Sequence, residues 1–148
     1  MGKNGIAEKS TMSKVFVDTN ILVYTLDNYN LAKQEKCRSL LKILKDGKGG
    51  VISTQILQEF YVVCVGKLKL DPLLVKSILH SLTNFEVVTV DTSLIEAAID
   101  CNILTQISFW DALVVVSAER ARCAKVWTED LNHGQVLRSV TIENPFLA

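Results

Sequence analysis

Cysteine pairs, long apolar runs and net charge are all missing from this sequence of 148 residues. Its four cysteines (Cys37, Cys64, Cys101 and Cys123) are widely spaced, each in a predicted helix. The absence of a C-x-x-C pair excludes a zinc knuckle, and the wide spacing gives no disulfide framework. Apolar runs such as Ala112–Val116 are far too short to span a bilayer. Sixteen basic residues balance sixteen acidic ones, which excludes a nucleic-acid binder that depends on its charge alone.

What remains is the composition of an ordinary globular protein, with 49% hydrophobic and 22% charged residues. The length favours one domain with one core. Residues 1–12 are polar and patternless, and they lack the apolar centre of a secretion signal. We therefore expect a disordered extension or a vector-derived remnant at residues 1–12 and a single domain at residues 13–148. We also expect a cytoplasmic protein without a membrane anchor.

Short apolar strands and amphipathic helices alternate along residues 13–148. Strands are predicted at Lys14–Val17, Val51–Ile52, Phe85–Val90, Lys125–Trp127 and Val140–Ile142. Helices are predicted from near Asn20, over Leu31–Asp46, from Ser53 or Thr54 to about Val65, from Asp71 to about Leu82, from a capping box at Ser93, and from a second capping box at Ser108 to about Ala121. Such alternation implies parallel strands joined by helical crossovers. The predicted fold class is α/β, a single-domain parallel β-sheet sandwiched by helices.

Four acidic residues stand near the carboxyl ends of the predicted strands, where ligands bind in parallel sheets. Asp18 directly follows the first strand, and Asp130 follows the fourth. Asp111 lies in the first turn of the last helix, and Glu59 lies on the apolar stripe of the helix after the second strand. Clustered carboxylates repel one another unless a divalent cation lies among them, and oxygen ligands favour Mg²⁺ or Mn²⁺ over zinc.

Each acid also has a purely structural interpretation. Asp18 fits the N-cap of the helix that follows it, and Asp111 fits the third helical position of a capping box. Glu59 fits the edge of the stripe, where its carboxylate reaches water, and Asp130 fits a turn. Four coincidences at one sheet edge are a weaker explanation than one carboxylate cluster, so we expect the acids to form a site.

The motifs VFVDTNILVY, LQEF, FWDALVVVSA and VWTEDLNHGQ, in this order and with the closing NPF, resemble those of the PIN-domain family. The resemblance covers nearly the whole chain from Ser13. The family consists of small metal-dependent ribonucleases and includes the VapC-type toxins of bacterial toxin–antitoxin pairs. The resemblance implies a PIN-like three-layer fold, Mg²⁺ or Mn²⁺ as cofactor, RNA as substrate and, for a toxin, an antitoxin protein as partner. It also implies catalytic and metal-binding roles for Asp18, Glu59, Asp111 and Asp130, with Asn20 and Thr128 as supporting polar residues.

The chemistry open to these residues agrees with an endoribonuclease. A carboxylate-bound divalent ion can bind a phosphate oxygen and orient and activate a water for in-line attack on a phosphodiester. Asp18 and Asp111 are expected to be the core ligands, and the sequence leaves open whether one ion binds or two. The alternative is a non-catalytic PIN-fold module that binds RNA or protein. A phosphoacceptor signalling domain fits poorly because Lys125 precedes its strand, and a haloacid-dehalogenase-type phosphatase would need an acid in place of Asn20.

Other residues keep two interpretations each. Trp110 either stacks on a nucleobase or is a core or wall aromatic, and His133 either touches a phosphate or caps its loop. Lys67 and Lys69 either bind RNA phosphates or belong to a solvated turn. The segment from Glu59 to Leu82 carries more apolar residues than one core can cover, which predicts a homodimer or an antitoxin surface.

Overall fold

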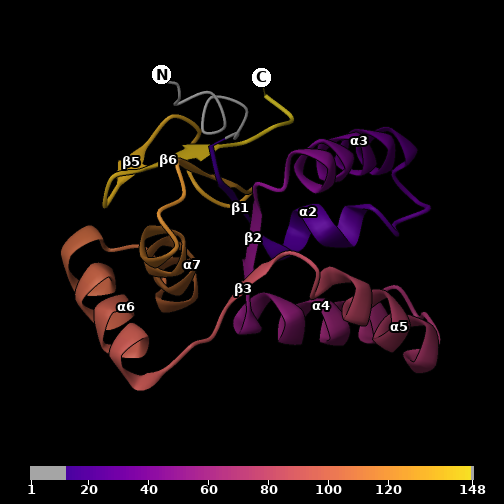
Figure 1. The fold of residues 1–148 in the computed structure, drawn as a ribbon, viewed down its shortest axis with the longest axis horizontal. Coiled ribbons are helices and arrows are strands. Elements are labelled where there is room, and N and C mark those ends of the chain that lie inside the picture. Colours follow the sequence, from indigo (N-terminus) through magenta and orange to yellow (C-terminus); the bar gives the residue numbers. More distant parts are fainter. Residues whose placement is uncertain (1–12, 148) are drawn as a thin grey trace, which may run out of the picture.

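A six-stranded sheet runs through the centre of the computed structural model, which describes residues 13–147 (Figure 1). The extension predicted at residues 1–12 lies outside the described residues. The strands are β1 (Val15–Val17), β2 (Gly50–Ser53), β3 (Glu86–Val88), β4 (Lys125–Trp127), β5 (Val136–Leu137) and β6 (Val140–Glu143). Their spatial order is β3-β2-β1-β4-β6-β5. All neighbouring strands are parallel except β5, which runs antiparallel to β6.

Helices cover both faces of this sheet, which confirms the predicted α/β fold class. The helices are α2 (Thr19–Tyr24), α3 (Leu31–Gly47), α4 (Thr54–Gly66), α5 (Pro72–Leu82), α6 (Thr92–Thr105) and α7 (Phe109–Arg120). Helices α6 and α7 lie on one side of the sheet, and α2 to α5 lie on the other (Figure 1). Within residues 13–147 no single helix has the length and apolarity to cross a membrane, and α6 with α7 meets that criterion only as a pair bent by 116°.

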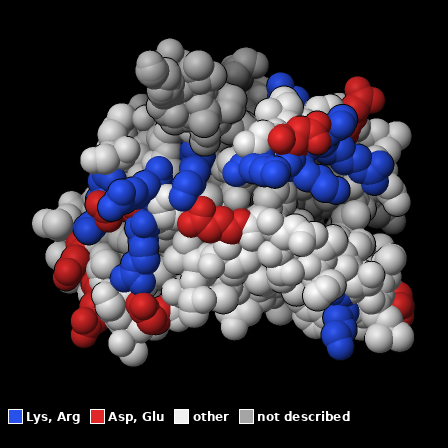
Figure 2. All heavy atoms as spheres, viewed as in Figure 1, with Lys and Arg blue, Asp and Glu red and all other residues white. Residues whose placement is uncertain are grey.

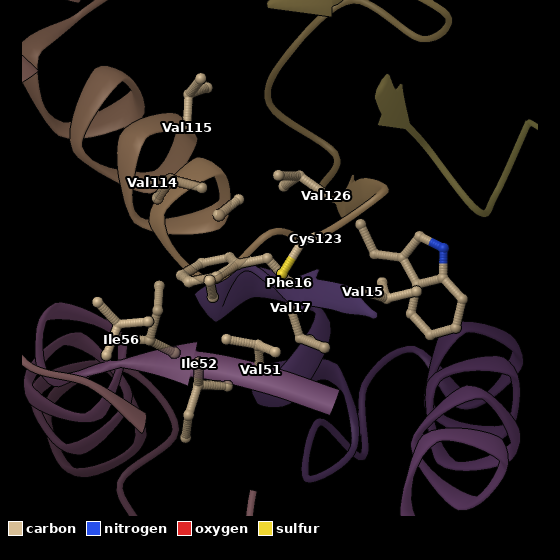
Figure 3. Packing of buried hydrophobic residues seen from close by; sticks show 14 of the residues in the cluster. Val15, Phe16, Val17, Val51, Ile52, Ile56, Val114, Val115, Cys123 and Val126 are labelled. Atoms are coloured by element: carbon tan, nitrogen blue, oxygen red, sulfur yellow. The ribbon is translucent and has the colours of Figure 1, made fainter. Parts of the chain in front are cut away.

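The core forms where the apolar strands meet α4 and α7. All three residues of β1 are buried, and Phe16 is inaccessible to solvent. Figure 3 shows side chains of β1, β2, α4 and α7 gathered in this one cluster. The run Ala112–Ala118 is buried on every side of α7, because that helix packs against both the sheet and α6. Such all-round burial explains why this stretch is continuously apolar rather than amphipathic.

Several local predictions are wrong. Helix α6 begins two residues early, because Asp91 rather than Ser93 accepts a hydrogen bond, of 2.8 Å, from the backbone N–H of Leu94. Strand β3 is shorter than predicted, because the N–H of Val90 donates to the Thr54 hydroxyl instead of to a strand. Cys123 lies in the turn after α7 rather than in a helix.

The order of the strands creates a crevice at the centre of the sheet. From β1 the chain adds β2 and β3 on one side, and it then returns to add β4 and β6 on the other side. In open α/β sheets, ligands bind outside the carboxyl ends of the strands at such a reversal. The segments that follow β1 and β4 therefore meet at the expected ligand-binding position.

Candidate active site

All four predicted acids line one cavity of about 540 Å³ at the carboxyl ends of β1 and β4. Asp18 lies directly after β1, and Asp130 lies in the loop after β4. Glu59 projects from α4, and Asp111 projects from the first turn of α7. Side chains that are 112 positions apart in the sequence, Asp18 and Asp130, are thus brought to one site by the parallel pairing of β1 with β4.

Asp18 is the most deeply buried of these acids, with 6% of its surface exposed. The Thr128 hydroxyl donates to its Oδ2 at 2.7 Å, and the backbone N–H of Thr19 donates to its Oδ1 at 2.8 Å. Burial raises the pKa of Asp18 from 3.8 to about 7. The two hydrogen bonds lower this pKa, and the charges of Asp130 and Glu59 raise it further. At neutral pH the protonated and the ionised forms of Asp18 are therefore both populated. A nearby cation would favour the ionised carboxylate.

Hydrogen bonds also hold Glu59 and Asp130 in place. The Thr19 hydroxyl donates to Glu59 Oε1 at 2.6 Å, and Gln55 Nε2 donates to Glu59 Oε2 at 3.2 Å. Asn20 Nδ2 donates to Asp130 Oδ2 at 3.0 Å. Two adjacent residues of α2 and one residue of α4 thus fix the direction in which these carboxylates point.

Asp111 takes part in the cap of α7 and also lines the cavity. Its backbone N–H donates to the Ser108 hydroxyl at 3.1 Å, which confirms the predicted cap of α7. Burial raises the pKa of its carboxyl, the Ser108 hydroxyl lowers it, and the charges of Asp130 and Glu59 raise it. Asp18 likewise is the N-cap of α2. A residue at a helix start can therefore belong to a cap and line the cavity at once.

A cluster around Glu129 fixes the loop that carries Thr128 and Asp130. The Tyr24 hydroxyl donates to Glu129 Oε1 at 2.6 Å, and Lys33 forms an ion pair with the same carboxylate. The Lys33 ammonium also lies over the Tyr24 ring, 4.8 Å from its centroid. This arrangement anchors the loop after β4 to helices α2 and α3.

Unpaired oxygens in the cavity suit a hard cation. Asn20 Oδ1 and Gln55 Oε1 are buried and have no hydrogen-bond partner among the described residues. The amide of Gln55 cannot be reversed, because its Nε2 donates to two oxygens, Glu59 Oε2 and the Trp110 carbonyl. Oxygen atoms of this kind are the preferred ligands of Mg²⁺ and Mn²⁺.

The acids of the cavity do not by themselves enclose a metal ion. Within residues 13–147, no three acidic, histidine or cysteine side chains are close enough to enclose a metal ion directly. Mg²⁺ usually keeps several of its waters and takes one or two carboxylates from the protein. The residues present therefore fit a cation that is held partly through water.

Several lining residues were not identified from the sequence. They are Thr19, Tyr24, Gln55 and Glu129. Gln55 was open to prediction, because it precedes Glu59 by four positions and so shares its helix face. The bond from Thr19 to Glu59 joins residues 40 positions apart and leaves no local signal. His133 accepts the backbone N–H of Asn144 at 3.0 Å, which favours its loop-capping interpretation.

Comparison with known proteins agrees with this fold and with the motifs. The PIN-domain model matches residues 15–137. The chain is similar to a solved toxin–antitoxin complex from Klebsiella pneumoniae, with a TM-score of 0.66 and 17% identity over 90% of this chain and 98% of that one. It is similar to DNA-bound VapBC from Salmonella typhimurium, with a TM-score of 0.65 and 19% identity over 89% of this chain and 98% of that one. It is also similar to VapC20 from Mycobacterium tuberculosis, a toxin that cleaves the sarcin–ricin loop, with a TM-score of 0.62 and 16% identity over 79% of this chain and 90% of that one. No protein of curated function matches the sequence. The chain belongs to the PIN-domain family.

Proposed function

We propose that the chain is a metal-dependent endoribonuclease that hydrolyses RNA phosphodiester bonds. The observation that carries this proposal is the meeting of Asp18, Glu59, Asp111 and Asp130 around one cavity at the reversal point of the sheet. Membership of the PIN-domain family supports nuclease chemistry. A non-catalytic module would have no need to place the charges of Asp130 and Glu59 where they raise the pKa values of Asp18 and Asp111.

Each of these residues has a definite task in the proposed mechanism. Asp18 and Asp111 would hold Mg²⁺ or Mn²⁺, and Glu59 and Asp130 would complete its surroundings directly or through water. The bound ion would polarise a phosphate oxygen and lower the pKa of a water molecule. Thr128 keeps one oxygen of Asp18 turned in a fixed direction, and Asn20 does the same for Asp130.

We further propose that the chain is the toxin of a toxin–antitoxin pair. The similar structures from Klebsiella pneumoniae and Salmonella typhimurium are complexes of this kind. A second groove, of about 760 Å³, lies between α3 and the end of α5 and would receive an acidic, amphipathic segment of the antitoxin. Its walls combine basic and apolar side chains with two acids: Arg38, Lys42, Lys45, Lys48, Leu41, Leu44, Leu82, Phe85, Asp46 and Glu86. A row of basic residues over α3 is visible in Figure 2.

Cleavage of single-stranded RNA tests the enzymatic proposal. Wild type should cleave in Mg²⁺ or Mn²⁺ and stop in EDTA, and folded Asp18→Asn should lose most of the activity. Asp100→Asn, an exposed acid on α6 outside the cavity, is the matched control and should cleave normally. Full cleavage in EDTA, or by Asp18→Asn, would refute the metal mechanism. RNA binding without cleavage would favour the non-catalytic module.

A further inference from the structure

Trp110 is a large aromatic side chain at the rim of the acidic cavity, and 62% of its surface is exposed. Its ring packs edge-on against Phe109, with centroids 5.0 Å apart and an interplanar angle of 80°. Its backbone carbonyl accepts a hydrogen bond of 3.3 Å from Gln55, the residue that also holds Glu59. The backbone of Trp110 and one side of its ring are thus fixed, while most of the ring faces solvent. The core interpretation of Trp110 is therefore wrong, and the residue is a wall aromatic of the cavity.

The cavity offers an anionic ligand few positively charged side chains. Among the described residues that line it are six carboxylates and one lysine: Asp18, Asp27, Glu59, Asp111, Glu129, Asp130 and Lys67. Nucleic-acid binders usually gain affinity by neutralising phosphates with lysine and arginine. Here a phosphate gains attraction from a bound cation and from Lys67 alone. The remaining affinity has to come from uncharged contacts, of which an exposed indole ring is the largest available.

We propose that Trp110 stacks on an unpaired nucleobase beside the phosphate that the acids address. This inference rests on the proposed nuclease function and narrows its substrate class. A base within a duplex is covered on both faces by its neighbours, so only a base in a single strand, loop or bulge can stack on the ring. Stacking on an aromatic side chain tolerates any sequence, because every base has a π-face. The substrate is therefore RNA with an unpaired base next to the cleaved bond.

Intrinsic fluorescence reports this contact without depending on cleavage. The chain has two tryptophans. Trp127 is 7% exposed, and its Nε1 is bonded to Glu143 at 2.6 Å, so it gives a constant background. Rapid mixing in Mn²⁺ with an eight-nucleotide single-stranded RNA should quench the emission of Trp110 before any product forms. The same RNA annealed to its complement should quench it far less.

Substitutions at position 110 separate stacking from mere packing. Trp110→Ala should weaken binding of the single strand by about 5- to 150-fold, the factor that corresponds to 1–3 kcal/mol for one stacked base. The salt dependence of RNA binding should stay unchanged, because the slope of log affinity against log salt concentration reports the number of phosphate contacts. Trp110→Phe should keep most of the affinity, and Trp110→Leu should not. Tyr29→Ala removes an aromatic that is 96% exposed and outside the cavity, and it should bind within twofold of wild type.

Kinetics complete the test. Loss of a stacking contact should raise KM and leave kcat nearly unchanged. Binding by Trp110→Ala within twofold of wild type, or no quenching in wild type, would overturn the inference. Equal losses in the Ala, Phe and Leu variants would also overturn it, because the ring would then only support Asp111.

If the Ala variant fails to fold, the comparison of Phe with Leu decides. Quenching without any cleavage by wild type would refute the nuclease function alone, and cleavage unaffected by Trp110→Ala would refute this inference alone.

Discussion

At the scale of single residues, Asp18 joins the fold to the site. Its carboxyl caps α2, accepts the Thr128 hydroxyl from the loop after β4, and faces the cavity that Glu59 and Asp130 also line. Burying a carboxylate costs free energy unless it is fully compensated. The two hydrogen bonds compensate in part, and the pKa of Asp18 still stays near 7 because of burial. In the absence of a cation, Asp18 therefore destabilises the folded protein once it ionises.

The stability of the metal-free protein should consequently fall as the pH rises from about 4 to above 7. Between these values the folded protein keeps a proton on Asp18 that the unfolded chain, with a pKa near 3.8, has already released. A raised pKa of an acid gives stability that is present at low pH and lost through the folded pKa. The rise in the pKa of Asp18 from 3.8 to about 7 corresponds to a loss of about 4 kcal/mol in the free energy of unfolding.

Asp18→Asn isolates this contribution. In EDTA the variant should exceed wild type in free energy of unfolding by a small margin at pH 5, and by a larger margin of a few kcal/mol at pH 8. Urea denaturation at both pH values measures the difference. A difference that stays constant between pH 5 and pH 8 would show that Asp18 does not titrate in this range.

At the scale of elements, α4 presents different residues to the core, to the cavity and to solvent. Phe60 and Cys64 face the core, and Glu59 faces the cavity. Tyr61 and Val62 are 38% and 67% exposed. The surface over α4 and α5 is largely uncharged in Figure 2. Contiguous apolar surface of this kind is typical of interaction sites.

We expect this surface to form a homodimer at high protein concentration. Val62→Glu should shift the protein toward the monomer, because a buried unpaired carboxylate opposes association. Val136→Glu, on the exposed edge strand β5, is the matched control and should leave the mass unchanged. Light scattering coupled to gel filtration measures the mass. A strict monomer for wild type at high concentration, with no protein partner bound, would contradict this prediction.

Alanine substitutions at two glycines, one in β2 and one at the end of α4, should have opposite effects on stability. A Cβ added to Gly50 in β2 would lie 2.6 Å from the Phe85 ring and 3.3 Å from Leu44 Cβ. Gly50→Ala should therefore destabilise the fold by about 1–3 kcal/mol through overpacking. Gly66, at the end of α4, would place its Cβ more than 4 Å from the other described residues, so Gly66→Ala should be neutral or stabilise by up to about 1 kcal/mol. Denaturant unfolding of both variants checks the contrast, and equal effects would contradict it.

The elements that sequence alone predicted are those with strong local signals. Ser108 caps α7 as expected, because its hydroxyl needs only the N–H three positions on. The cap at Ser93 was wrong, since Arg120 from α7 binds both Asp91 and Ser93. Strand β5 was missed because its hairpin turn uses Arg138 and Ser139, both with positive φ, where the usual sequence signal is Asn-Gly.

The residues that line the cavity likewise include some that the sequence predicts and some that it does not. The cavity positions of Asp18 and Asp130 follow from parallel strands and could be predicted from the sequence. The side chains that hold the acids could not, because they depend on contacts between distant segments. Lys33 reaches Glu129 across 96 positions, and no pattern along the chain links the two.

At the scale of the whole molecule, the site is made by topology rather than by any one motif. The reversal of strand order at β1 opens a crevice, helices α2, α4 and α7 supply its walls, and acids gather there at a cost to stability. Retaining such repulsion is characteristic of functional sites, where activity and stability oppose each other. A divalent cation that binds only the folded state would offset this loss of stability. The central claim is therefore that these four acids form one cation site.

Thermal unfolding of wild type and Asp18→Asn, each in EDTA and in Mn²⁺, tests this claim most directly. In EDTA at pH 8 the variant should melt at a higher temperature than wild type, because one repelling charge is gone. Mn²⁺ should stabilise wild type by about 2.7 kcal/mol when it reaches 100 times its dissociation constant. The variant should respond much less. Equal melting temperatures in all four conditions would contradict the account, because acids that act only as caps and turn residues have no reason to respond to manganese.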